Sequence, residues 1–196
     1  TAMKSCFEAN ADFQFLPKEA PELLEHCFEV KAGSGTEMRL QKIVSYHAST
    51  DERSKMLAGD PAELMSRVWK LGFDGLAQDQ KAYLDSFWER ADIQIDGDIS
   101  LQQSVRFNIF HLLQAAGRDG HTNLGAKGLT GEGYDGHYFW DTEIYALPFF
   151  TYSQPDIARA LLKYRIHTLD RARARARELS HKGALFPWRT INGDEA

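Results

Sequence analysis

Cysteine is scarce in this chain, and long apolar runs are missing. The 196 residues include two cysteines, too few for a disulfide framework. Cys6 and Cys27 could pair, but we expect free, buried thiols. No apolar run approaches the roughly 20 residues that span a bilayer, and the first residues lack a basic-then-apolar signal pattern. We therefore expect a cytoplasmic protein without a membrane partner.

An excess of positive charge is also missing. Twenty-three basic and 28 acidic residues give a net charge of −5, which disfavours nucleic acid as a partner. The alternating arginines from Arg171 to Arg177 do not change this prediction, because on a helix residues two apart point to nearly opposite sides. We expect this run to form ion pairs on a helix surface, with Asp170 and Glu178 beside it.

Several motifs that carry chemistry are absent as well. No glycine-rich stretch is followed by the Lys-Ser/Thr pair of a phosphate-binding loop, and no serine lies in a Gly-x-Ser-x-Gly elbow. The histidines are scattered, without the spacing of a zinc site. We therefore expect no metal and no serine nucleophile.

The first quarter of the chain has the pattern of β-strands. Short alternating apolar runs lie between Cys6 and Ser49, and Gly33-Ser34-Gly35 predicts a turn. Three or so strands cannot make an independent sandwich, and the last five residues have loop chemistry. We therefore expect a fragment of a larger protein.

The rest of the chain has helical periodicity. Asp60 is the expected N-cap of the first helix, and a second helix is expected after Gly75. Ser100 is expected to cap a third helix that ends at Gly117. Seven glycines from Gly117 to Gly136 then predict a long loop. Beyond it, helices are expected in two ranges, from Tyr138 to Phe150 and from about Asp156 to Leu179.

The segment after the glycine-rich loop contains the candidate binding residues. Trp140 is followed directly by Asp141, and an indole beside a carboxylate can cover the apolar face of a sugar while accepting hydrogen bonds from its hydroxyls. The structural alternative is a core tryptophan and an N-capping aspartate. Residue types alone leave both interpretations open.

Further carboxylates lie near this pair and at the end of the chain. Glycoside cleavage needs a positioned acid together with a second carboxylate or an external nucleophile. Spacing alone does not show which pair converges, and solvated surface acids are the ordinary alternative for each. The candidates are Glu132, Asp135, Asp141, Glu143, Asp194 and Glu195.

Two longer sequence blocks carry a family resemblance. The first runs from Gly125 to Tyr134 and continues from Gly136 to Ile144 with the sequence Gly-His-Tyr-Phe-Trp-Asp-Thr-Glu-Ile. The second, Lys182 to Gly193, reads Lys-Gly-Ala-Leu-Phe-Pro-Trp-Arg-Thr-Ile-Asn-Gly. Both resemble glycoside hydrolase family 65, the maltose, kojibiose, nigerose and trehalose phosphorylases. The second block is most similar to the maltose phosphorylase branch.

The resemblance implies a mainly α fold with three parts. Residues 1–58 would be the end of an N-terminal β-sandwich, residues 59–98 a helical linker, and residues 99–196 the start of an (α/α)₆ barrel. Four or so helices cannot close a twelve-helix barrel, so apolar helix faces would be exposed unless another polypeptide covers them. The remainder of the same polypeptide or a homodimer mate would be that partner.

The resemblance also implies an activity. Family members split an α-linked glucose disaccharide with inorganic phosphate as co-substrate and no cofactor, with inversion, to give β-glucose 1-phosphate and a free sugar. Trp140 and Asp141 would bind the transferred glucose unit, and Arg189 would line the acceptor side. The catalytic glutamate of the family belongs to a later motif, expected beyond Ala196, and Glu195 does not take its place.

This departure leaves alternatives open. We expect no catalytic residue in this chain and no activity of the chain alone. The chain could also be a non-catalytic, truncated carbohydrate-binding remnant. A third possibility is a hydrolase of the same family, since some relatives use water in place of phosphate.

Overall fold

The computed structural model describes residues 2–46 and 61–196. The chain divides into two compact units, one ending at Ala82 and one comprising Tyr83–Ala196. The expected N-cap at Asp60 and the predicted boundary at residues 58 and 59 lie outside the described residues.

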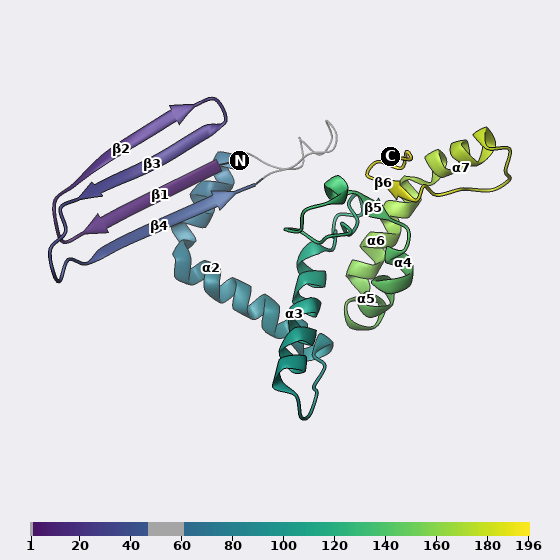
Figure 1. Ribbon diagram of the computed structural model, residues 1–196, viewed down its shortest axis with the longest axis horizontal. Helices are drawn as coiled ribbons and strands as arrows, with labels where there is room; N and C mark the ends of the chain where they lie inside the picture. The colour runs from purple at the N-terminus through teal and green to yellow at the C-terminus, as the bar shows by residue number, and fades with distance from the viewer. Residues whose placement is uncertain (1, 47–60) are drawn as a thin grey trace. The chain divides into compact units, whose positions relative to one another are not determined.

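The first unit contains four strands of eight residues each, arranged as two antiparallel ribbons (Figure 1). One ribbon pairs β1 (Ala2–Ala9) with β4 (Met38–Ser45). The other is a hairpin of β2 (Phe13–Ala20) and β3 (Leu23–Val30). The predicted strand region is confirmed, and its first strand begins before Cys6.

Aromatic side chains join the two ribbons. The Phe7 ring of β1 stacks on Phe28 of β3 with 4.8 Å between centroids and meets Phe13 of β2 edge-on at 4.9 Å. Phe15 stacks on the Phe28 ring as well, at 5.0 Å. No residue from 2 to 46 is fully buried. The described strands therefore form an aromatic seam without an enclosed core.

The long helix α2 (Pro61–Ala91) runs from the first unit into the second. It is interrupted at Gly72, whose φ of 72° and ψ of 177° are not helical. The predicted break at Gly75 is therefore wrong by one turn. Gly72 adopts the positive φ that only glycine tolerates easily, whereas Gly75 stays helical.

The second unit is helical. The third helix predicted along the chain is present. Its N-cap is Asp98 and not Ser100, because the Asp98 carboxylate accepts the backbone N–H groups of Ser100 and Leu101. These hydrogen bonds lower the pKa of Asp98. The helices after α2 are α3 (Ile99–Ala115), α4 (Thr142–Tyr145), α5 (Leu147–Ser153), α6 (Pro155–His167) and α7 (Leu169–Glu178).

Two predicted helices differ from the structure. The range from Tyr138 to Phe150 begins with a strand, β5 (Tyr138–Phe139), because these residues pair with β6 (Arg189–Thr190) near the end of the chain. The last predicted helix is two helices, α6 and α7, which meet at Thr168, where ψ is 2°. The glycine-rich stretch is a loop as predicted, with one short 3₁₀ turn, Tyr134–Gly136.

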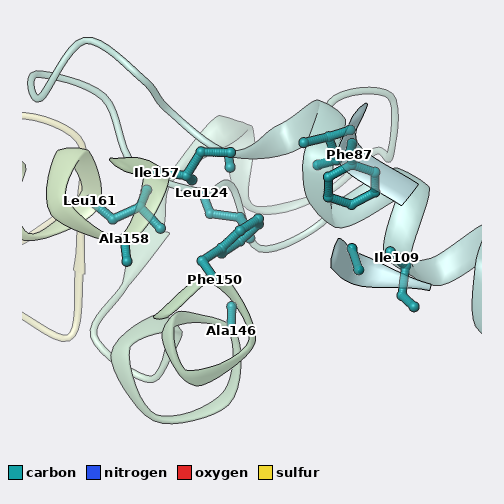
Figure 2. Close-up of a cluster of buried hydrophobic side chains, with 11 residues drawn as sticks. Phe87, Ile109, Leu124, Ala146, Phe150, Ile157, Ala158 and Leu161 are labelled. Carbon is teal, nitrogen blue, oxygen red and sulfur yellow. The ribbon is translucent and has the colours of Figure 1, made fainter. Parts of the chain in front are cut away.

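The core of the second unit collects apolar side chains from α2, α3, α5 and α6, together with Ala146 between α4 and α5 (Figure 2). Phe150 and Leu161 have no exposed surface, and Phe87 and Leu113 have only 2%. Leu124 of the glycine-rich loop joins this cluster. Leu124 thereby attaches the loop to the helices.

Two further sequence expectations can be compared with the described residues. Cys6 and Cys27 are free, but each is half-buried and not fully buried. No helix in residues 2–46 or 61–196 is long and apolar enough to cross a membrane.

Candidate functional site

A two-residue strand pairing places the two tryptophans of the sequence blocks beside each other. In the antiparallel register, Tyr138 faces Thr190 and Phe139 faces Arg189. One further step of this register sets Trp140 opposite Trp188. Cross-strand neighbours of this kind have side chains in contact. Two segments about 50 residues apart in the chain thus meet at one place.

The two indoles contact each other and remain partly open to solvent. Their ring centroids lie 5.2 Å apart with an interplanar angle of 76°, a T-shaped arrangement. The ring of Phe139 meets that of Trp188 edge-on, with 5.7 Å between the ring centroids, and Phe139 is itself buried. Trp140 is 41% exposed and Trp188 is 51% exposed. Trp140 is therefore not a core residue.

Asp141 is the N-cap residue of α4, directly after the exposed indole of Trp140. Its backbone carbonyl accepts the N–H groups of Ile144 and Tyr145, both at 3.0 Å, but its carboxylate makes no capping hydrogen bond. In the described part of the chain, this half-buried carboxylate has no ion pair either. Asp141 thus occupies the N-cap position of the structural alternative, but capping does not account for its carboxylate.

Arg189 lies across the strand pair from Phe139. Its Nη2 donates to the Asp135 carboxylate of the glycine-rich loop at 3.0 Å. Its Nε is buried and has no hydrogen-bond partner among the described residues. The structure thus brings Arg189 into the same strand pair as Trp140 and Trp188, facing the loop.

Most of the candidate carboxylates are held by arginines. Asp135 pairs with Arg189, Glu143 with Arg165, Asp194 with Arg171 and Glu195 with Arg175. These four carboxylates are therefore already engaged by ion pairs within the chain. Asp141 is thus the carboxylate at the tryptophans that is not occupied in this way.

The arginine run on α7 forms ion pairs, as predicted. Arg173 pairs with Asp170 within the helix, at 3.1 Å. Arg171 and Arg175, which share a helix face, both pair with acids of the last three residues. This face therefore holds the C-terminal segment against α7.

The buried Tyr164 of α6 and the half-buried Tyr138 of β5 support the strand pair. The Tyr164 hydroxyl donates to the carbonyl of Ile191 at 2.9 Å, and its ring meets Tyr138 edge-on at 5.3 Å. Burial raises the pKa of Tyr164 to about 12 and also raises the pKa of Tyr138. Both tyrosines therefore remain neutral, acting as packing and hydrogen-bonding groups.

Sequence reasoning missed the site role of Trp188 and of the arginine–glutamate pairs. Trp188 lies inside the second sequence block, one residue before Arg189, so the block itself contained the signal. The partners Arg165 and Arg175 lie outside both blocks, in helices where arginine is common. Nothing in their spacing indicated which acids they would meet.

The arrangement can bind a small polar ligand that has an apolar face. Two half-exposed indoles offer surfaces for C–H groups, and one unpaired carboxylate beside them can accept hydroxyl hydrogen bonds. Residues 2–46 and 61–196 contain no group of three histidine, cysteine or acidic side chains that could hold a metal ion. A pyranose has the matching combination of an apolar face and a rim of hydroxyls.

Comparison with known families identifies the class of protein. Residues 106–196, which contain all of the site described above, match the family model of the glycosyl hydrolase family 65 central catalytic domain. This part of the chain belongs to glycosyl hydrolase family 65, and the resemblance of the two sequence blocks is confirmed.

Individual relatives support the same assignment. The chain is 52% identical to the alpha,alpha-trehalose phosphorylase of Thermoanaerobacter brockii over 85% of its own length and 22% of the relative. It is 58% identical to the alpha,alpha-trehalose phosphorylase of Geobacillus stearothermophilus over 68% of its length and 18% of the relative. The chain thus spans about a fifth of these relatives.

A solved structure extends the likeness over the whole chain. A protein described as a candidate kojibiose phosphorylase from the human microbiome aligns with a TM-score of 0.72 and 33% identity. The alignment covers 99% of this chain and 26% of that one.

Proposed function

We propose that this chain is the part of an inverting disaccharide phosphorylase that binds the transferred glucose unit. Trp140 and Asp141 hold the glucose, and Arg189 lies on the acceptor side. The observation that carries the proposal is the exposed indole of Trp140 beside the unpaired carboxylate of Asp141. The membership of residues 106–196 in a family with phosphorylase members supports it.

Each residue has a distinct role in this binding. The indole of Trp140 covers the apolar C–H face of the pyranose, which removes about 25 cal/mol of unfavourable hydration per Å² of contact. The carboxylate of Asp141 accepts hydrogen bonds from glucose hydroxyls, and hydrogen bonds to a charged acceptor contribute about 1.5–3 kcal/mol. Together they orient the anomeric carbon.

The reaction follows from phosphate as the nucleophile. One phosphate oxygen bonds to the anomeric carbon from the face opposite the leaving oxygen, and the glycosidic bond breaks with inversion. A glutamic acid supplies the proton for the leaving oxygen. The family resemblance implies that this glutamate and the phosphate-binding residues belong to a later motif that residues 1–196 do not contain. We therefore propose that the chain acts within a longer cytoplasmic enzyme.

In that enzyme the chain contributes three parts. Residues 1–58 end a β-sandwich, residues 59–98 form a linker, and residues 99–196 begin an (α/α)₆ barrel. The half-exposed aromatics of the strand ribbons, such as Phe13 and Phe15, fit a role as one side of a larger sandwich. Exposed apolar residues of α3 and α5, such as Phe107 and Tyr152, fit helices with further barrel neighbours.

The disaccharide is an α-linked glucose dimer. The block from Lys182 to Gly193 favours a maltose-type substrate. The two relatives at 52% and 58% identity are trehalose phosphorylases, which makes trehalose the second candidate. Assaying phosphorolysis of maltose, trehalose, kojibiose and nigerose side by side decides between them. Release of glucose without glucose 1-phosphate would favour a hydrolase.

The proposal is tested in an enzyme of full relative length that contains this chain. Trp140→Ala and Asp141→Asn are each expected to lower kcat/KM for phosphorolysis at least about 100-fold, because a misplaced glucose unit loses its reactive geometry. Leu129→Ala serves as a control, since Leu129 is a 70% exposed residue of the same loop region. Unchanged kcat/KM in both site variants would overturn the glucose-binding assignment. An unmodified enzyme without turnover that still binds glucose would indicate the carbohydrate-binding remnant instead.

A further inference from the structure

Two arginine–glutamate pairs of the second unit have the same construction. In each pair, one arginine of a helix reaches a glutamate carboxylate and also a backbone carbonyl just before one of the two site tryptophans. Arg165 of α6 serves the Trp140 segment, and Arg175 of α7 serves the Trp188 segment. These two helices are consecutive in the chain.

The first pair anchors the chain on both sides of Trp140 and Asp141. Arg165 binds the Glu143 carboxylate through Nε and Nη2, at 2.8 and 2.9 Å. Its Nη2 also donates to the carbonyl of Phe139 at 3.0 Å. The two anchors, residues 139 and 143, enclose the proposed glucose-binding residues.

The second pair anchors the backbone at Trp188. The Glu195 carboxylate accepts the backbone N–H of Trp188 at 3.1 Å and that of Arg189 at 3.2 Å. Arg175 pairs with this carboxylate at 2.7 Å and donates to the carbonyl of Phe186 at 3.4 Å. The backbone of Trp188 and Arg189 is therefore attached to α7 through Glu195 and Arg175.

These pairs differ from ordinary surface ion pairs on the same two helices. The Arg165 and Arg175 side chains are 10% and 27% exposed, whereas Arg159 and Arg173 are 68% and 54% exposed. Among residues 2–46 and 61–196, Arg159 and Arg173 form ion pairs only with acids three residues away in their own helix. The bidentate, largely buried Arg165–Glu143 pair restricts geometry far more than an exposed pair does. The Arg175–Glu195 pair is less buried, and it acts on the backbone through the two N–H groups that Glu195 accepts.

We propose that Arg165 and Arg175 are positioning residues that set the two site tryptophans in their T-shaped contact and thereby aim Trp140 and Asp141 at the glucose unit. The proposal rests on the glucose-binding function proposed above. Neither arginine touches the sugar. Each acts through a glutamate, Glu143 or Glu195, and through the backbone next to a tryptophan.

The experiment uses the full-length enzyme with glutamine at each of the four positions in turn: Arg165→Gln, Glu143→Gln, Arg175→Gln and Glu195→Gln. Arg159→Gln and Arg173→Gln are the matched controls from the same helices. The first readout is the exciton couplet of the Trp140–Trp188 pair in circular dichroism, defined as the difference between the parent and Trp188→Phe spectra. The second readout is the separate measurement of KM and kcat for phosphorolysis.

We expect the four site variants to lose most of the couplet and to raise KM for the disaccharide about 10-fold or more, because small misplacements of binding groups are costly. The two controls should keep both values. A purely structural role would reduce the amount of active enzyme, and hence the apparent kcat, with the couplet and KM unchanged in the folded fraction. That result would overturn the proposal.

Two further variants keep the test decisive. If Arg165→Gln does not fold, Arg165→Lys keeps the charge but loses the planar fork, and it should still weaken the couplet. If all four site variants keep the couplet and none of them has a raised KM, the positioning role is contradicted, even when Trp140→Ala abolishes activity. If the site variants lose the couplet but keep their KM, and the Trp140→Ala enzyme is active, then the proposed glucose binding by Trp140 is contradicted. The positioning of the two indoles by the arginines would still hold.

Discussion

The two units of this chain differ in how far their apolar side chains are buried. In the strand unit, Phe13 and Phe15 are 44% and 45% exposed, although their rings join the aromatic seam between the ribbons. In the helical unit, Phe150 and Leu161 have no exposed surface. The difference shows that the described strands are joined by backbone pairing and aromatic contacts without a buried core, while the helices pack around one.

The site follows the helical unit in this respect. Trp140 and Trp188 are open to solvent, but the buried Phe139 ring contacts Trp188, and the buried Arg165 binds the Phe139 carbonyl and the Glu143 carboxylate. Exposed binding groups on a packed foundation are typical of ligand sites. The strand unit offers no comparable foundation among its described residues.

The largest contrast between the units should come from truncating one phenylalanine in each. Phe150→Ala removes a fully buried ring and should lower the free energy of unfolding by about 3–5 kcal/mol. Phe15→Ala removes a half-exposed ring and should cost about 1 kcal/mol, the size of an aromatic pair. Chemical denaturation of the two variants checks the ratio. Equal losses would show that the strand unit has a core after all.

A smaller effect is expected from the backbone of α2. Gly72→Ala places a side chain at a φ of 72° and should cost about 1–2 kcal/mol in the free energy of unfolding. Gly75→Ala is the comparison for backbone conformation, because Gly75 is helical. Its added Cβ would lie 2.6 Å from Cγ and Cδ1 of Leu71, so only this half-exposed side chain has to change its rotamer. Thermal denaturation compares them. Unchanged thermal stability of Gly72→Ala would mean that α2 can form a continuous helix through residue 72.

The smallest effect concerns Tyr164 and appears with pH. Because the pKa of Tyr164 is about 12 in the folded chain and 10.0 ordinarily, the folded state keeps a proton that the unfolded chain releases. The free energy of unfolding should therefore fall as pH rises from about 10 to about 12. Tyr164→Phe should lose about 1 kcal/mol at neutral pH with its hydrogen bond to Ile191.

Denaturation curves across this pH range provide the measurement. The fall should be shallower in Tyr164→Phe than in the parent chain. Tyr152→Phe is the matched control, since Tyr152 is 90% exposed. A parent and a Tyr164→Phe variant with the same pH dependence would show that the buried hydroxyl does not control this part of the curve.

Part of the fold could be predicted from local chemistry. The alternation between Cys6 and Ser49 indicated strands, and the glycines after Gly117 indicated a loop, because both signals lie within a few neighbouring residues. The break in α2 was placed at Gly75 and not at Gly72, since both glycines permit a break and packing selects one. The helix predicted from Tyr138 was wrong for a different reason: its first residues find a strand partner about 50 positions away.

The amino-acid sequence by itself determined the family resemblance, the mainly helical character of the chain after its first strands, and Trp140 and Asp141 as candidate binding residues. These properties depend on residue types and short spacings. Only the tertiary structure decided that Trp188 stands opposite Trp140 and that Arg165 and Arg175 hold both segments. Strand pairing and buried ion pairs join residues far apart in the chain, so their partners are selected by packing and not by spacing.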